Sequence, residues 1–153
     1  MSQKKTPHTS TLLRRLFKAN NLDRFLKENE AALAGPAFHE YISGILMERG
    51  VPAEAIINRS GIERTYGHQL FNGTRKPSRD KVIQLAIGFG MNAGETQELL
   101  KIAGKPLLYP RIDRDCVLLF GINKGYGIME IQELLHEKGA TILGGSPKYE
   151  DIT

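Results

Sequence analysis

One short segment of the sequence gathers side chains with the hydrogen-bonding chemistry that reads DNA bases. On a helical wheel at about 100° per residue, residues 63–72 divide into two faces. One face is uncharged or basic and can donate hydrogen bonds throughout: it holds Arg64, Thr65, His68, Gln69 and Asn72. Arginine pairs with guanine edges and glutamine or asparagine with adenine, and a major groove admits one helix. We therefore assign base reading to Arg64, Thr65, His68 and Gln69.

The opposite face of this segment would anchor it in a core, and a second helix would position it. The anchoring residues are Tyr66, Gly67, Leu70 and Phe71. A shorter helix precedes, with Pro52 in its first turn and Ile56 and Ile57 facing inward. Gly61 lies where the chain must reverse, and Gly73 lies where the second helix must end. Glycine accepts the left-handed conformation that both places need.

The span from Pro52 to Gly73 resembles the phage-repressor and Cro-type (XRE) helix-turn-helix. Gly61 matches the turn glycine, Ile62 matches the buried residue after it, and Leu-Phe-Asn-Gly at 70–73 matches the usual end of the recognition helix. The resemblance implies that Arg64, Thr65, His68 and Gln69 take base-reading positions. It also implies that Asn72 contacts the DNA backbone.

The sequence departs from the repressor pattern at two places. Ala53 and Glu54 stand where a glutamine commonly contacts phosphate, and Glu63 replaces a small cap residue with a charge that would repel phosphate. These departures favour an alternative function, a protein-interaction module that keeps the fold without specific DNA readout. Such a module would be a signalling or antitoxin-like adaptor.

A basic loop follows the predicted recognition helix and leads into another helix. Ser78 is a good N-cap for that helix, and Asp80 lies in its first turn, where the helix dipole favours an acid. A loop and a helix start offer both N–H groups and cations to a phosphate; a solvated loop with a cap is the alternative. We assign DNA-backbone contacts to Asn72, Thr74, Arg75, Lys76 and Arg79.

Basic residues concentrate in two parts of a chain whose formal net charge is +4. Residues 1–18 hold five lysines or arginines and no acid, and residues 59–81 hold six against two acids. Positive charge at an N-terminal arm and around residues 63–72 is typical of a protein that binds a polyanion. Scattered basic patches without functional meaning are the alternative.

The composition indicates one domain, or a small domain with appendages, in 153 residues. Cys116 is the single cysteine, which excludes an internal disulfide and fits a cytoplasmic protein. No apolar run approaches the roughly 20 residues of a membrane span, so we expect no membrane partner.

No group of side chains has the spacing of a catalytic or metal site. His39 lacks the second histidine of a zinc-binding HExxH motif, and Cys116 is expected in the core beside Val117 and Leu118. We therefore expect no enzymatic activity, no cofactor and no metal. The four histidines fall in separate segments: His8, His39, His68 and His136.

Helical periodicity and end signals predict an all-α fold. A helix over residues 36–49 is followed by the two helices that end near Gly61 and Gly73. Further helices start at Ser78 and at Asn92, where Glu95 completes a capping box. Residues 36–104 thus contain five helices, the number and order of a lambda-repressor-like helix-turn-helix domain.

We divide the chain into four parts. Residues 1–35 form a basic N-terminal arm with short helices, and residues 36–104 form the helix-turn-helix domain. Residues 105–143 form a C-terminal helical hairpin packed on that core, and residues 144–153 a flexible tail. Within the arm, we expect disorder over residues 1–10 and short helices over residues 11–18 and 22–29.

Residues 79–104 recur 35 residues later. Without gaps, 11 of 26 positions are identical to residues 114–139, and Glu-x-Gln-Glu-Leu-Leu-x-x-x-Gly occurs in both copies. Two similar hairpins would stack and bury their apolar stripes; convergence of capped hairpins on one pattern is the alternative. Pro106–Arg111 and the second copy also resemble the segment after the helix-turn-helix in a group of uncharacterised bacterial regulators. In this copy we expect burial of Val117, Leu118, Phe120, Ile122, Ile131, Leu134 and Leu135.

The sequence therefore favours a sequence-specific binder of double-stranded DNA, a transcription regulator that docks residues 63–72 in the major groove. Repressor-type domains usually read two half-sites as dimers. A homodimer is thus one open alternative, and a protein partner at the C-terminal hairpin is another.

Overall fold

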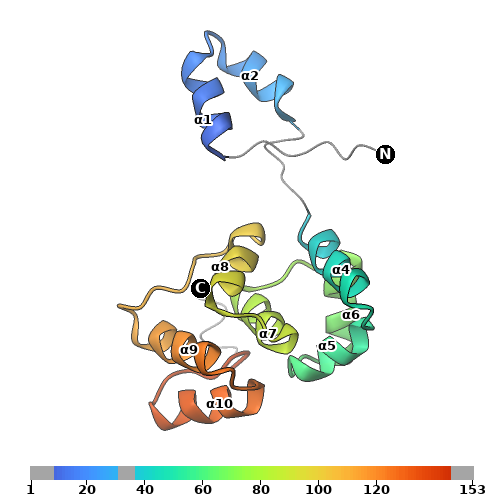
Figure 1. The fold of residues 1–153 in the computed structure, drawn as a ribbon, viewed down its shortest axis with the longest axis vertical. Helices are drawn as coiled ribbons and strands as arrows, with labels where there is room; N and C mark the ends of the chain where they lie inside the picture. The colour runs from blue at the N-terminus through green and yellow to red at the C-terminus, as the bar shows by residue number, and fades with distance from the viewer. Residues whose placement is uncertain (1–8, 31–36, 146–153) are drawn as a thin grey trace. The chain divides into compact units, whose positions relative to one another are not determined.

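The computed structural model describes residues 9–30 and 37–145 of the 153-residue chain. Within these residues the protein is all-helical, with nine helices and no strand (Figure 1). The chain forms two compact units, residues 1–37 and residues 38–153. Of the helices in the described ranges, none combines the length and the apolar character needed to cross a membrane.

The first unit contains two short helices, α1 (Thr9–Lys18) and α2 (Leu22–Glu28). Asn21 caps α2 by accepting a backbone amide hydrogen bond, and Phe25 is buried. α1 begins two residues earlier than predicted, so the expected disorder of residues 9 and 10 is wrong; short polar residues are well tolerated at a helix start. The expected disorder of residues 1–8 lies outside the described part of the chain, and so do residues 146–153 of the flexible tail expected over residues 144–153. Gly144 and Gly145 are described, and their amides donate to Asp80 and to the Ile142 carbonyl, both at 3.0 Å.

The second unit begins with five helices: α4 (Phe38–Arg49), α5 (Ala53–Arg59), α6 (Arg64–Asn72), α7 (Arg79–Phe89) and α8 (Ala93–Ile102). Each helix contributes to one core, where Ile42, Ile57, Leu70, Leu85 and Leu99 are at most 2% exposed. Pro52 occupies the N-cap position of α5 in an extended conformation (φ −78°, ψ 151°), instead of lying in the first turn, and makes no side-chain cap hydrogen bond.

The predicted starts of α7 and α8 are confirmed. Ser78 accepts a hydrogen bond from the Lys81 amide at 3.2 Å. Asn92 and Glu95 form the expected capping box, with distances of 2.8 and 3.0 Å between the side-chain oxygens and the backbone nitrogens. These caps satisfy amides that a helix start leaves without partners.

The last two helices, α9 (Asp113–Lys124) and α10 (Ile128–Glu137), form a hairpin against α7 and α8 (Figure 1). α10 contacts α7, and α9 contacts α8. These two contacts are equivalent, because α9 and α10 are the counterparts of α7 and α8 in the sequence repeat. Gly90 and Gly125, 35 residues apart, end α7 and α9 with φ values of +71° and +76°. The sequence repeat is therefore a structural repeat.

Two matching ion pairs join the hairpins. Nη1 and Nη2 of Arg79 donate to the two carboxylate oxygens of Asp115 at 3.0 and 2.9 Å. Arg114 binds Asp80 in the same way, also at 3.0 and 2.9 Å. Arg79 and Arg114 occupy the same position in the two copies of the repeat, and so do Asp80 and Asp115. A two-fold exchange of the hairpins would leave this pattern unchanged.

Two residues of α9 for which burial was expected are exposed. Cys116 is exposed, and Phe120 retains 49% of its surface. The counterpart of Phe120 is Leu85, which is fully buried in α7, a helix that packs against α5. No helix of the described chain takes the place of α5 against α9. Burial in α9 instead includes Leu118 and Ile122, which face the first hairpin and α10.

Candidate nucleic-acid interface

α5 and α6 lie unusually close together because a glycine stands at their contact. A Cβ atom at Gly67 would lie 2.5 Å from Cγ2 of Ile57, far inside normal carbon contact. Gly61, with φ +68°, makes the turn between the helices. The inner face of α6 is buried as predicted at Gly67, Leu70 and Phe71. The orientation of α6 is thus determined by two glycines and its apolar face.

Glu63 caps the start of α6. Its carboxylate oxygens accept the backbone amides of Thr65 and Tyr66 at 2.9 and 2.8 Å. These hydrogen bonds lower the pKa of Glu63 below its ordinary value of 4.5, and the bond from Tyr66 has the larger effect. The acid that departs from the repressor pattern therefore has a structural role, since it satisfies donors at the helix start.

The four predicted base-reading residues lie on one face of α6. Arg64 and Thr65 are exposed in the first turn, and His68 and Gln69 are half-buried in the next. Residues at these spacings lie one above the other on a helix. The structure therefore brings together the side chains that the sequence assigned to base contacts.

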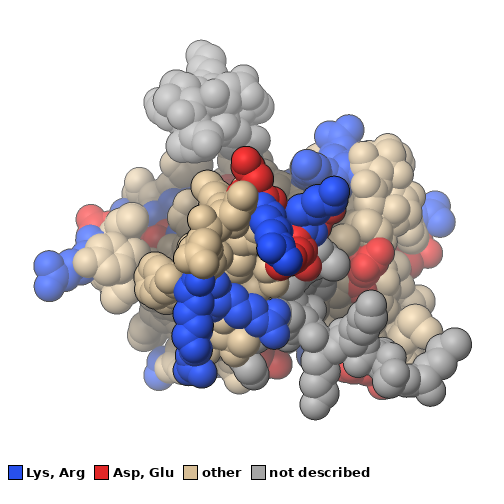
Figure 2. All heavy atoms as spheres, turned by 90° about the horizontal axis from the view of Figure 1, so that it is seen from above, with Lys and Arg blue, Asp and Glu red and all other residues tan. Residues whose placement is uncertain are grey.

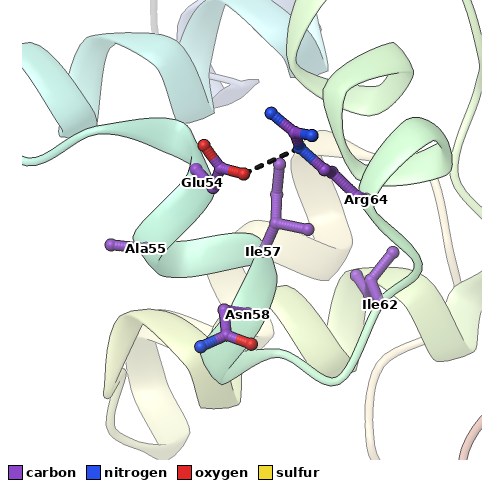
Figure 3. A pocket seen from close by; sticks show the side chains of 6 residues that line it. All are labelled: Glu54, Ala55, Ile57, Asn58, Ile62 and Arg64. Atoms are coloured by element: carbon purple, nitrogen blue, oxygen red, sulfur yellow. Dashed lines mark ion pairs between the residues drawn. The ribbon is translucent and has the colours of Figure 1, made fainter.

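Arg64 makes an ion pair that the sequence did not predict. Its Nε lies 2.7 Å from Oε1 of Glu54 on α5, and the two side chains are 74% and 57% exposed. Figure 3 shows the pair beside Ile57 at an open hollow of about 460 Å³. Ion pairs this exposed contribute about 0–1 kcal/mol. Another acceptor for Arg64, such as a guanine edge, could therefore replace Glu54 at little cost.

Gln69 and Arg75 bind each other beside an aromatic ring. Nε of Arg75 donates to Oε1 of Gln69 at 3.1 Å. The guanidinium carbon of Arg75 lies 4.5 Å from the centre of the Tyr66 ring, and Nζ of Lys81 lies 5.5 Å from it. Each such contact contributes about 0.5–1 kcal/mol at an exposed site. Arg75, assigned to backbone contacts, is therefore hydrogen-bonded to Gln69, assigned to bases, and the Tyr66 ring lies against Arg75.

The loop after α6 presents polar groups outward from a buried anchor. Gly73 ends α6 with φ +83°, and Oδ1 of Asn72 accepts the Thr74 amide at 2.9 Å. The amide nitrogen of Asn72 can then donate to a phosphate oxygen. Lys76 is exposed beside Pro77, which is buried. The loop is thus anchored at one residue while its charged neighbour faces solvent.

Arg79 differs from the other residues assigned to the DNA backbone, because its side chain is engaged within the protein. Its side chain is 24% exposed and pairs with Asp115, which is 1% exposed. Nε and Nη2 also donate to the carbonyl oxygens of Pro106 and Leu107, both at 2.9 Å. A guanidinium engaged by a buried carboxylate is not available to a phosphate. Arg79 therefore belongs to the interface between the hairpins.

Several exposed cations lie on and near α6. Arg59, Arg64, Arg75 and Lys76 are all exposed on α5, α6 or the following loop. On the face drawn in Figure 2, lysines and arginines gather in several groups, with acidic and neutral residues between them. Exposed lysines and arginines are residues that contact phosphates in protein–DNA complexes.

Comparison with known proteins supplies no relative: no protein-family description matches the sequence, and no curated protein or solved structure matches the chain. Within residues 9–30 and 37–145 no group of three or more histidine, cysteine or acidic side chains is placed to hold a metal ion.

Proposed function

We propose that the chain binds double-stranded DNA sequence-specifically, as a transcription regulator of the cytoplasm with α6 docked in the major groove. In this proposal α4–α8 are a lambda-repressor-like helix-turn-helix domain, and α6 is its recognition helix. One observation carries the proposal. Four side chains able to pair with bases share the outer face of a helix whose position is set by the close Gly67–Ile57 contact.

The DNA backbone would be bound by the end of α6 and the loop after it. Asn72, Thr74, Arg75 and Lys76 are exposed there, and two of them carry positive charge. Contacts with phosphate fix the register of a protein on DNA, whereas contacts with base edges select the sequence. Arg75 would contact the DNA backbone and also orient Gln69 toward the bases through the hydrogen bond between the two side chains.

A protein-interaction module is the second candidate function, and exposed apolar side chains favour it. Met129 on α10 is 75% exposed, Phe120 on α9 is 49% exposed, and Met47 on α4 is 84% exposed. Methionine and aromatic residues are enriched where proteins bind one another. These positions lie on helices other than α6.

Selection of bound sequences from a random duplex pool at moderate salt tests the proposal. The wild type should enrich a motif, and the double variant Arg64→Ala, Gln69→Ala should lose it. Lys101→Ala, on the exposed side of α8, is the matched control and should keep the motif. Failure of the wild type to enrich any motif would contradict DNA reading and favour the interaction module.

A further inference from the structure

The contact between the two hairpins has the form of a symmetric dimer interface. In a two-fold dimer, residue i of one subunit contacts residue j of the other, while j contacts i. Here Arg79 binds Asp115 and Arg114 binds Asp80, with the same bond lengths. Each aspartate also accepts a hydrogen bond from a backbone amide of a loop. Tyr109 donates to Asp115 at 2.9 Å, and Gly144, 35 residues after Tyr109, donates to Asp80 at 3.0 Å.

Each hairpin also closes its own loop with the same hydrogen bonds. Gln97 clamps Leu108 through its nitrogen and oxygen, both at 2.8 Å. Gln132 clamps Leu143, 35 residues further on, at 2.8 and 2.7 Å. The first hairpin therefore includes its loop up to about residue 108. The ion pairs between arginines and aspartates, in contrast, cross from one hairpin to the other.

A single reverse turn connects the two hairpins. The turn is Tyr109–Ile112, and a hydrogen bond from the Ile112 amide to the Tyr109 carbonyl closes it at 3.0 Å. Pro110 restricts Tyr109 to extended backbone, which also suits an opened chain. Tyr109 and Ile112 are 52% and 51% exposed, although both have large apolar surfaces. Opening this turn would release the second hairpin without disturbing bonds inside either one.

We propose that two copies of this chain form a dimer by exchanging their α9–α10 hairpins through opening of the Tyr109–Ile112 turn. Every contact across the interface re-forms between the chains, because exchange changes only which chain supplies each side. The buried carboxylates keep their arginine partners, and the apolar face with Leu118 and Ile131 stays covered. The two opened linkers run past each other, so that the exposed Tyr109 and Ile112 side chains can cover one another.

Charge-reversed full-length variants test the exchange directly. Arg79→Asp places two acids together within one chain, and Asp115→Arg places two arginines together. Mixed in equal amounts, the two variants can restore both ion pairs only by exchanging hairpins. We expect a heterodimer of twice the monomer mass in analytical ultracentrifugation, and little dimer from either variant alone. The double variant Arg79→Asp, Asp115→Arg is the matched control, because it restores opposite charges within one chain.

Two outcomes would overturn the proposal. The first is a mixture that forms no heterodimer although the double variant folds, since the contact would then be made only within a chain. The second is the absence of mixed dimers when ¹⁵N-labelled and unlabelled wild-type chains are mixed at high concentration and their masses are measured by native mass spectrometry. Absence of mixed dimers there excludes exchange even if the charge variants fail to fold. Neither readout involves DNA, so the result is independent of the proposed function.

Discussion

Arg79 and Asp115, 36 residues apart in the sequence, form a bidentate ion pair in which the aspartate is 1% exposed. The pair joins the start of α7 to the start of α9. It also keeps Arg79 from an outside partner, because its guanidinium is bound to Asp115 and to the carbonyl oxygens of Pro106 and Leu107. The core with α6 and the C-terminal hairpin are therefore connected through the residue that the sequence had placed at the DNA backbone.

Removal of this arginine should destabilise the protein strongly. Arg79→Ala leaves a buried carboxylate with the Tyr109 amide as its remaining partner, and breaking a buried pair in this way costs about 3–5 kcal/mol. Arg114→Ala should cost less, because its partner Asp80 is 15% exposed. Urea unfolding measures both effects. Arg111→Ala, at an exposed position, is the control, and an equal loss in all three variants would contradict a cost set by burial of the carboxylate.

Two helical glycines should respond in opposite ways to the same substitution. Gly67→Ala places a methyl group into Ile57, and such overpacking costs about 1–3 kcal/mol. Gly44, within α4, has nothing within 4 Å of its Cβ position. Gly44→Ala should therefore stabilise the protein by about 1 kcal/mol, since alanine favours a helix over glycine. Thermal unfolding distinguishes the two, and a stabilising Gly67→Ala would show that α5 and α6 do not pack as described.

The cap at Glu63 should make the stability of the protein depend on acid pH. The pKa of Glu63 is lowered in the folded state, so its contribution is complete above the ordinary value of 4.5 and is lost as the pH falls through the lower folded value. The difference in unfolding free energy between wild type and Glu63→Ala should therefore shrink at acid pH. Glu133→Ala, an exposed acid on α10, is the control. A difference that stays constant down to full protonation would exclude the carboxylate cap.

Base contacts from α6 should appear as lost affinity for the preferred sequence only. Arg64→Ala or Gln69→Ala should each weaken binding of the selected duplex by about 1–3 kcal/mol and relax its sequence preference. Fluorescence anisotropy with the selected duplex and a scrambled one separates the two effects. Unchanged binding in both variants would mean that α6 does not face the bases.

Lys76 and Arg75 should differ although both are cations in one loop. Lys76→Ala should weaken all duplexes about equally and lower the slope of log affinity against log salt by about 0.9. Arg75→Ala should lower that slope and also change the base preferred opposite Gln69, because Arg75 donates to its side-chain oxygen. Binding of duplexes varied at one base pair over a salt series measures both. Identical preference profiles for the two variants would place Arg75 at the backbone alone.

The sequence by itself determined the helices of the second unit and the buried face of α6. Caps such as Ser78, Asn92 and the glycines at 61 and 73 act over a few residues, so their effects can be predicted locally. The grouping of Arg64, Thr65, His68 and Gln69 followed from helical spacing in the same way. The 35-residue repeat predicted a second hairpin, since like sequences form like elements.

Tertiary structure decided which of these residues are free to act and which are buried. Arg79 looked identical in type to Arg75, but only the fold brings Asp115 back to it. Phe120 copies the core position of Leu85 in the first hairpin, yet it is exposed, and no helix of the described chain equivalent to α5 covers α9. Cys116 copies Lys81 instead, and it is exposed although its apolar neighbours in the sequence predicted a core residue. Long-range pairing and the presence of a covering element depend on the path of the whole chain, and local patterns in a sequence do not contain that path.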